Sequence, residues 1–295
     1  MRTIDKKTAR RFLLGKQGLW PGRRMQGLEG TELALREMEY LQLDPLQIIA
    51  RSHDIQLYGR VLDYTPGMWE VAAYERRGFF DWGGWLATRP MDELPYWLAV
   101  MRRERDGHPD ANARIIQMGQ EHAEAVKEMR AILRERGTVS NRDFSAAKRK
   151  RTNSYRGRKD SSVALYYLWR TGEVMTHHRE NFERVYALTE EVAPAHLLEP
   201  LSDDEVDRFL FKKEISFSGL ARLQRVGDSY GRGVPFSKKQ EMLETLLAEG
   251  EIVEVKIDGW RGTHCVLTAD VLLLDDLSAG RVPEAWTPLG TTTME

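Results

Sequence analysis

The feature of this sequence that most constrains its fold is a short pattern of helix-ending and strand-starting residues that occurs twice. Residues 168–174 read Leu-Trp-Arg-Thr-Gly-Glu-Val, and residues 246–252 read Leu-Leu-Ala-Glu-Gly-Glu-Ile. In each copy a glycine follows a helical run and a β-branched residue starts the next segment, which predicts a helix end followed by a strand. The same helix-ending glycine and strand-starting residue at matching places indicate internal repetition. A fainter third copy lies at residues 74–80, before the aromatic run Trp82 to Trp85.

The residues around the first copy predict one complete unit. We expect helices at 127–135, 141–147 and 161–170, a short strand at 138–139, and two strands, 173–176 and 184–188, around a turn at 178–181. This order is typical of a winged helix, in which the third helix enters the major groove of DNA. Around the second copy we expect helices at 203–213 and 237–247 and a hairpin of 252–255 with 265–267. Helix–glycine–strand punctuation is also common in unrelated α+β proteins.

The predicted fold class is therefore mainly α with small β-hairpins (α+β), built from tandem winged-helix units. We expect an N-terminal winged-helix-like unit at 1–115, a central winged helix at 116–195, and a third winged helix with a β-rich C-terminal segment at 196–295. A chain of 295 residues with 41% hydrophobic residues can bury a sizeable core in such an arrangement.

The distribution of charge, rather than its sum, suggests a nucleic-acid partner. The net charge is -1, which by itself does not indicate DNA binding. Basic residues are nevertheless concentrated just before the expected third helix of the central unit, where clustered cations fit a phosphate clamp. The candidates are Lys148, Arg149, Arg151, Arg156, Arg158 and Lys159. A solvated basic loop is the alternative interpretation.

The remaining composition indicates a cytoplasmic protein without a cofactor. The single cysteine, Cys265, cannot form an internal disulfide, and neither a signal peptide nor a membrane-spanning stretch is apparent. The seven histidines lack metal-ligand spacing, so we expect no metal site. We find no phosphate-binding glycine loop, and Gly83-Gly84 is interpreted as a turn.

A polar pair at residues 41–45, Leu-Gln-Leu-Asp-Pro, carries the chemistry that we expect. The alternation predicts a short strand with Leu41 and Leu43 inward and with Gln42 and Asp44 together on the other face. Arg51, His53 and Arg60 follow and add polar and basic groups that we expect to contact DNA. Taken alone, the segment is more typical of a surface strand that ends in a turn than of a catalytic site.

Together with the repeats, these residues resemble the YcaQ-like and AlkZ-like family of winged-helix DNA glycosylases. The similarity runs in order through most of the chain, including Arg51-Ser52-His53, Asn181-Phe182 and Gly259-Trp260. The Gln–apolar–Asp triplet is the form seen in the YcaQ-like branch, whereas the AlkZ-like branch carries a second Gln in place of Asp. Family members usually continue into a longer C-terminal β-rich region, so this chain is expected to be a shorter or truncated form.

The resemblance implies excision of alkylated bases from duplex DNA, with Gln42 and Asp44 as the catalytic residues. The expected enzyme is a monofunctional glycosylase of base excision repair that acts on N7-alkylpurines, bulky or crosslinked adducts included. It would act as a monomer in the cytoplasm, associated with the nucleoid when on DNA. Two alternatives stay open: a non-catalytic winged-helix DNA-binding protein or transcriptional regulator, and a relative that has lost activity.

Overall fold

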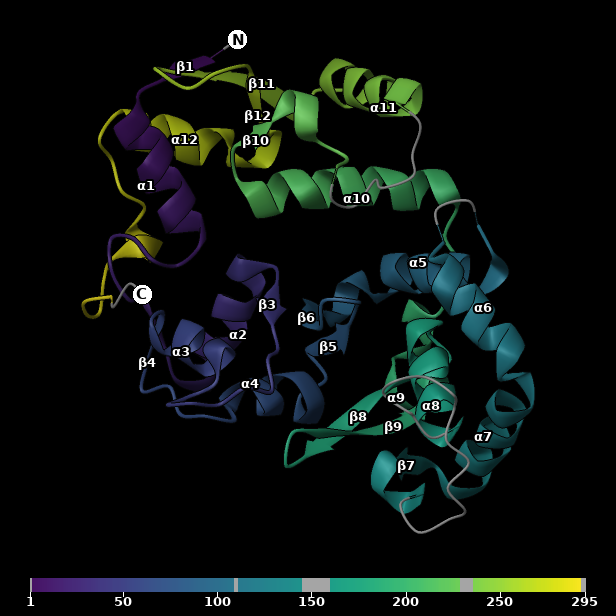
Figure 1. The fold of residues 1–295 in the computed structure, drawn as a ribbon. Coiled ribbons are helices and arrows are strands. Elements are labelled where there is room, and N and C mark those ends of the chain that lie inside the picture. Colours follow the sequence, from purple (N-terminus) through teal and green to yellow (C-terminus); the bar gives the residue numbers. More distant parts are fainter. Residues whose placement is uncertain (1, 109–110, 145–159, 229–235, 293–295) are drawn as a thin grey trace. The chain divides into compact units, whose positions relative to one another are not determined.

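The computed structural model describes residues 2–108, 111–144, 160–228 and 236–292, and Figure 1 shows its fold. The chain divides into two compact units. Unit 1 comprises Met1–Leu41, Gln47–Met68 and Ser202–Glu295, and unit 2 comprises Gln42–Leu46 and Trp69–Leu201. These boundaries differ from the three ranges expected from the sequence, and the winged-helix assignment stays a prediction.

Unit 1 combines segments from both ends of the chain in one sheet. Its strands are ordered β1-β11-β12-β10, where β1 (Arg2–Ile4) runs parallel to β11 (Ile252–Ile257), and β12 (His264–Leu267) lies between β11 and β10 (Ala221–Arg222), as Figure 1 shows. A second, two-stranded sheet pairs β2 (Met25–Gln26) with β4 (Val61–Leu62). The helices are α1 (Lys6–Lys16), α2 (Gly27–Met38), α3 (Ser52–Tyr58), α10 (Asp203–Ser218), α11 (Phe236–Ala248) and α12 (Val271–Ser278).

Local chemistry explains where the helices of unit 1 begin and end. Helix α1 begins after Asp5, whose carboxylate accepts the N–H of Thr8 at 2.8 Å. Helix α10 begins with a capping box between Ser202 and Glu205. After α11, Gly250 adopts a φ of 72°, a left-handed conformation that glycine takes without strain. The core of the unit packs α1 and α12 against the sheet, with Phe12 and Leu274 fully buried.

Unit 2 contains two three-stranded sheets and most of the buried tryptophans. One sheet has the order β3-β6-β5 and the other β7-β9-β8. Their strands are β3 (Leu41–Gln42), which spans the boundary between the units, β5 (Phe79–Trp82), β6 (Ala87–Pro90), β7 (Thr138–Ser140), β8 (Val174–Glu180) and β9 (Glu183–Leu188). The helices are α4 (Met68–Glu70), which spans the boundary between the units, a π-helix at Val71–Glu75, α5 (Leu94–Asp106), α6 (Ala113–Glu121), α7 (Ala123–Arg136), α8 (Asp160–Arg170) and α9 (Thr189–Val192).

The predicted fold class is confirmed, because the described chain is mainly helical with small sheets. The expected helices at 127–135, 161–170, 203–213 and 237–247 correspond to α7, α8, α10 and α11. Where a helix was expected at 141–147, the structure has a 3-10 turn at Asn141–Phe144. The remaining residues of that range lie outside the described residues. Among the described residues, no helix is both long and apolar enough to cross a membrane.

The turn predicted at residues 178–181 is wrong in position. Strand β8 continues to Glu180, so His177 and His178 lie within the strand. The turn consists of Asn181 and Phe182. Both turn residues have positive φ, 49° and 69°. Two consecutive left-handed residues form the tight hairpin turn whose twist matches that of paired strands. The hairpin is therefore longer and its turn tighter than the sequence suggested.

Candidate active site

The segment with the polar pair lies beside the strand β6 of unit 2. Leu41 and Leu43 are buried, whereas Gln42 is exposed and Asp44 is partly exposed, so the predicted alternation is confirmed. The N–H of Leu43 donates to the carbonyl of Leu86 at 2.8 Å, which continues the pairing of β3 by one residue. The amide of Gln42 and the carboxylate of Asp44 therefore belong to the outward face of one extended segment.

The carboxylate of Asp44 is oriented by its own backbone. Its Oδ1 accepts the N–H of Leu46 at 2.8 Å, across Pro45. This is the local turn that aspartate forms two residues onward along the chain. Within the described part of the chain, Asp44 makes no ion pair, so its second oxygen has no cationic partner there. An oriented, partly exposed carboxylate can accept a proton or stabilise a developing positive charge.

Large apolar side chains are exposed close to this carboxylate. Among the described residues of unit 2, only Leu46 and Trp85 are large hydrophobic residues with exposed side chains, at 73% and 76%. Leu46 donates the hydrogen bond to Asp44, and Trp85 precedes Leu86, the partner of Leu43. Exposed apolar groups gathered beside polar groups are typical of a binding surface. Sequence reasoning missed both residues, although a tryptophan directly after two turn glycines was a usable signal.

The three downstream residues expected to contact DNA differ in their surroundings in unit 1. His53 is fully buried. Arg60 is 8% exposed, and its guanidinium donates to the carbonyls of Gln17 at 2.6 Å and Gln56 at 2.8 Å. Arg51 is partly exposed at the start of α3. This placement favours structural roles for His53 and Arg60, and contact of Arg51 with DNA stays a prediction.

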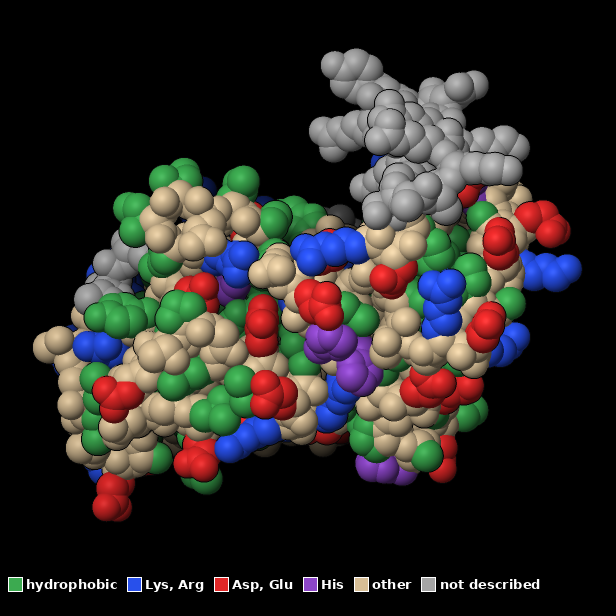
Figure 2. Space-filling view, turned by 90° about the horizontal axis from the view of Figure 1, so that it is seen from below, with side chains coloured by type: hydrophobic (Ala, Val, Ile, Leu, Met, Phe, Trp, Pro, Cys, Tyr) green, Lys and Arg blue, Asp and Glu red, His purple; other side chains and the backbone are tan. Residues whose placement is uncertain are grey.

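The basic candidates between 148 and 159 lie outside the described residues, so their contact with DNA stays a prediction. These are Lys148, Arg149, Arg151, Arg156, Arg158 and Lys159. Where side chains are coloured by type in Figure 2, acidic and basic groups are interspersed over the face shown. Neither sign of charge therefore dominates the face shown.

A second aspartate of unit 2 has a very different environment, which sequence reasoning missed. Asp81 on β5 is 3% exposed and forms ion pairs with Arg179 and with Arg184, the latter at 3.3 Å. Arg179 also donates to the hydroxyl of Tyr74 at 2.8 Å and to the carbonyl of Phe182 at 2.8 Å. These contacts attach the β8–β9 hairpin to β5. The available signal was a lone acidic residue within the run Phe79 to Trp82, since a charge in a buried strand needs a partner.

The ion network sets the protonation of its members. Burial alone would raise the pKa of Asp81, but Arg179 and Arg184 outweigh it and hold that pKa below its usual value. Burial, and then the charge of Asp81, raise the pKa of Tyr74. Burial would lower the pKa of Arg179, yet the charge of Asp81 raises it. Asp81 is therefore a charged, structural carboxylate.

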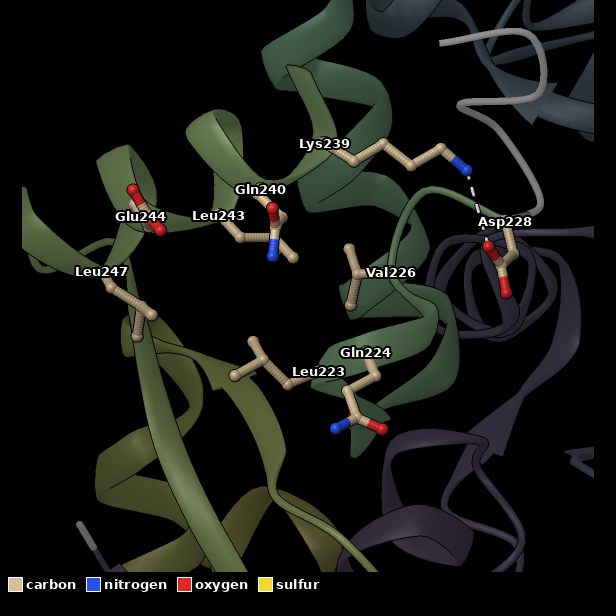
Figure 3. A pocket seen from close by; sticks show the side chains of 9 residues that line it. All are labelled: Leu223, Gln224, Val226, Asp228, Lys239, Gln240, Leu243, Glu244 and Leu247. Carbon is tan, nitrogen blue, oxygen red and sulfur yellow. Dashed lines mark hydrogen bonds and ion pairs between the residues drawn. The ribbon is translucent and has the colours of Figure 1, made fainter. Parts of the chain in front are cut away.

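A hollow of about 660 Å³ lies within unit 1, between α11 and the 3-10 turn at Leu223–Arg225 (Figure 3). Its lining is largely apolar, with Leu223, Val226 and Leu243 facing it. Its lysine, Lys239, approaches Asp228 to 3.5 Å. Neither Gln42 nor Asp44 lines this hollow. The candidate active site at the polar pair is therefore a different site.

Comparison with known proteins identifies the family. A family model described as "DNA glycosylase AlkZ-like" matches residues 35–290. The chain belongs to the AlkZ-like family of DNA glycosylases. The match includes the segment with Gln42 and Asp44 and all of unit 2. For a member of the AlkZ-like family, DNA is the expected substrate and base removal the expected reaction.

The AlkZ-like fold is also found among solved structures. The chain is similar to the Streptomyces sahachiroi DNA glycosylase AlkZ, with a TM-score of 0.66 and 15% sequence identity. The similarity covers 96% of this chain and 74% of that protein. At this identity the likeness concerns the fold, and the chemistry of this AlkZ-like chain depends on its own residues.

Proposed function

We propose that this chain hydrolyses the N-glycosidic bond of N7-alkylpurines in duplex DNA, including bulky or crosslinked adducts. The observation that carries the proposal is the state of Asp44. Its carboxylate is partly exposed, is oriented by the N–H of Leu46, and makes no ion pair among the described residues. Membership of a DNA glycosylase family supports the reaction class.

The chemistry of the substrate explains why one carboxylate is sufficient. Hydrolysis of a neutral glycoside usually requires a second carboxyl group that protonates the leaving group. A purine alkylated at N7 already carries positive charge and leaves without protonation. The enzyme then has to stabilise an oxocarbenium-like sugar and deprotonate a water molecule, and Asp44 supplies both functions. Gln42, exposed on the same face, holds the water by hydrogen bonds.

This mechanism is monofunctional. No amine attacks the sugar, so no covalent intermediate links the protein to DNA, and the strand stays intact. The products are the free base and an abasic site. We propose that Arg51 and the basic run at Lys148–Lys159 bind the DNA backbone. We also propose that the protein acts as a monomer in the cytoplasm, on the nucleoid.

The test is single-turnover release of base from a duplex that carries one N7-methylguanine. We expect wild-type protein to release the base and leave an alkali-sensitive abasic site without cleaving the strand. Asp44→Asn should lower the rate on the order of 10³-fold, since it removes both the charge and the proton acceptor. Gln42→Ala should lower it on the order of tenfold to a hundredfold, because water is positioned less well.

Asp204→Asn is a matched control, because Asp204 is an exposed carboxylate on α10 of unit 1 and has no hydrogen bond or ion pair within the described chain. It should leave release unchanged. Wild-type protein that releases no base would refute the proposed function. Full release by Asp44→Asn would refute the assignment of the catalytic carboxylate.

A further inference from the structure

Trp85 differs from every other tryptophan of the chain. Of the eight tryptophans, all of which lie in the described ranges, the other seven are buried or partly buried, whereas Trp85 is 76% exposed. Tryptophan is highly buried on average, because its large apolar ring gains most from leaving water. An indole that is exposed to this extent is typical of a surface that a ligand covers.

The segment that presents Trp85 is a tight turn between β5 and β6. Gly83 adopts a φ of 118° there, and an added Cβ would lie 3.1 Å from the carbonyl oxygen of Trp85. Glycine is required at Gly83 because L-residues rarely adopt this conformation. The side chain of Trp85 consequently leaves the hairpin from a short connection with little backbone freedom.

The base of this hairpin is packed and bonded within unit 2. Trp82 contacts Trp97 at 6.0 Å between ring centroids and donates its indole N–H to the carbonyl of Arg170 at 3.2 Å. The guanidinium of Arg89 stacks on Trp97 at 3.7 Å from the ring centroid. Packed supports of this kind reduce the entropy that a binding group loses when its ligand arrives. Trp85 is thus an exposed aromatic group in the turn of a hairpin whose base is packed.

The hairpin also places Trp85 next to the candidate catalytic carboxylate. The hydrogen bond from Leu43 N–H to Leu86 O is 2.8 Å long. Asp44 and Trp85 are each one residue from that bond, so their backbones are neighbours at the edge of the same sheet. Both belong to unit 2, as does exposed Leu46. One small surface therefore offers an indole, a carboxylate and an isobutyl group.

We infer that Trp85 is the stacking platform for the alkylated base, and that it recognises the positive charge of that base. The inference rests on the proposed function. A purine alkylated at N7 is a planar cation, and the indole face is the aromatic surface that attracts cations most strongly. Undamaged purines are neutral and gain the stacking contribution alone. Trp85 therefore favours the damaged base before Asp44 acts on the sugar.

The first test is excision. Trp85→Leu keeps an apolar side chain but removes the π face, and it should lower single-turnover release of N7-methylguanine on the order of tenfold. Trp85→Phe keeps a smaller and weaker π face, and should lower release by about threefold. Leu272→Ala is the control for losing exposed apolar surface, since Leu272 is 78% exposed on α12, and it should release base at the wild-type rate.

The second test separates charge recognition from a structural role. The probes are two duplexes, one with 2′-fluoro-stabilised N7-methylguanine, which is cationic and resists hydrolysis, and one with 7-methyl-7-deazaguanine, its neutral isostere. Wild-type protein should bind the cationic duplex about fivefold more tightly. Trp85→Leu should bind the two with equal affinity, Trp85→Phe should give an intermediate ratio, and Leu272→Ala should keep the wild-type ratio.

The outcomes distinguish the inference from the proposed function. If wild-type protein releases no base from a hydrolysable duplex, the proposed function fails, whatever the binding ratio. If it releases base while Trp85→Leu keeps the wild-type rate and ratio, only the inference about Trp85 fails. If Trp85→Leu weakens binding to damaged and undamaged duplex equally, Trp85 contacts the DNA generally and the inference is also wrong.

Discussion

Asp44 and Asp81 are two aspartates of unit 2 that lie by strands of the same small sheet and differ in almost every other respect. Asp81 is 3% exposed and paired with two arginines. Asp44 is partly exposed and its described hydrogen bond comes from the backbone N–H of Leu46. A buried carboxylate that is paired with fixed cations holds strands together, whereas a partly exposed carboxylate without an ion pair can act on a substrate.

The comparison separates stability from activity within one sheet. Asp81 connects β5 to the β8–β9 hairpin, so its loss should act on folding. Within the described chain, the side chain of Asp44 bonds only to the N–H of Leu46 in its own turn. Its loss should therefore lower the rate of base release and leave the free energy of unfolding unchanged. Substitutions in the Asp81 network should therefore lower the free energy of unfolding by amounts that follow the number of contacts each one removes.

Asp81→Ala should cause the largest loss of stability. Removing the carboxylate leaves the buried guanidinium of Arg179 and the partly buried one of Arg184 without their anion, which costs about 3–5 kcal/mol. Urea unfolding followed by circular dichroism measures the change. Asp204→Ala, at an exposed position, should stay within about 0.5 kcal/mol of wild type. A value for Asp81→Ala as small as that of Asp204→Ala would show that the network does not stabilise the unit.

Arg184→Met should have an intermediate effect. The arginine is 3.3 Å from the carboxylate of Asp81 and stacks on Trp169 at 4.2 Å from the ring centroid. Methionine keeps much of the apolar contact but loses the charged hydrogen bond, so we expect a loss of about 2 kcal/mol. Because Arg179 still pairs with Asp81, the loss should be smaller than for Asp81→Ala. The opposite order in the same urea experiment would contradict the assignment of Asp81 as the centre of the network.

Tyr74→Phe should cost less again. The Tyr74 hydroxyl accepts a hydrogen bond from Arg179 at 2.8 Å, and Phe removes that acceptor without changing the ring. We expect a loss of about 1.5 kcal/mol, at the lower end for hydrogen bonds to charged groups. A double-mutant cycle with Asp81→Asn should show coupling between the two sites. Strict additivity would mean that the Tyr74 hydroxyl acts independently of the ion pairs.

The pH dependence should be the smallest effect near neutrality. The pKa of Asp81 is lower in the folded protein than its ordinary value, so its stabilising contribution is complete above an unfolded pKa of about 4. The difference in unfolding free energy between wild type and Asp81→Asn should stay constant from about pH 8 to pH 5. It should shrink as the pH falls further, when the unfolded chain binds the proton first. A difference that grows on acidification would contradict this sign.

Local sequence patterns predicted the part of the fold that local chemistry determines. The helix ends at Gly172 and Gly250 were predicted correctly, and both glycines have positive φ, 77° and 72°. The fainter third copy departs from the pattern, because Arg77, with a φ of 55°, takes the left-handed conformation in place of Gly78. The alternation at residues 41–44 was also predicted correctly, since burial follows side-chain direction along a strand.

Contacts between distant residues account for what the sequence could not reveal. Asp81 and Arg179 are 98 positions apart, and no periodicity relates them. The hairpin turn was misplaced because Phe182 adopts a left-handed conformation beneath the guanidinium of Arg179, 4.7 Å from the ring centroid. The exposure of Trp85 likewise depends on distant contacts, because Trp82 at the base of its hairpin packs on Trp97 and bonds to Arg170. The polar pair was found because its two members are only two residues apart in the sequence, whereas the members of the Asp81 network come from distant segments.

The most direct test of this division measures activity and stability on the same sample of Asp44→Asn. Single-turnover release of N7-methylguanine from duplex DNA should fall on the order of 10³-fold, while the free energy of unfolding in urea stays within about 0.5 kcal/mol of wild type. Release at the wild-type rate, or a loss of release matched by a loss of folding, would contradict the account of Asp44 as a catalytic carboxylate.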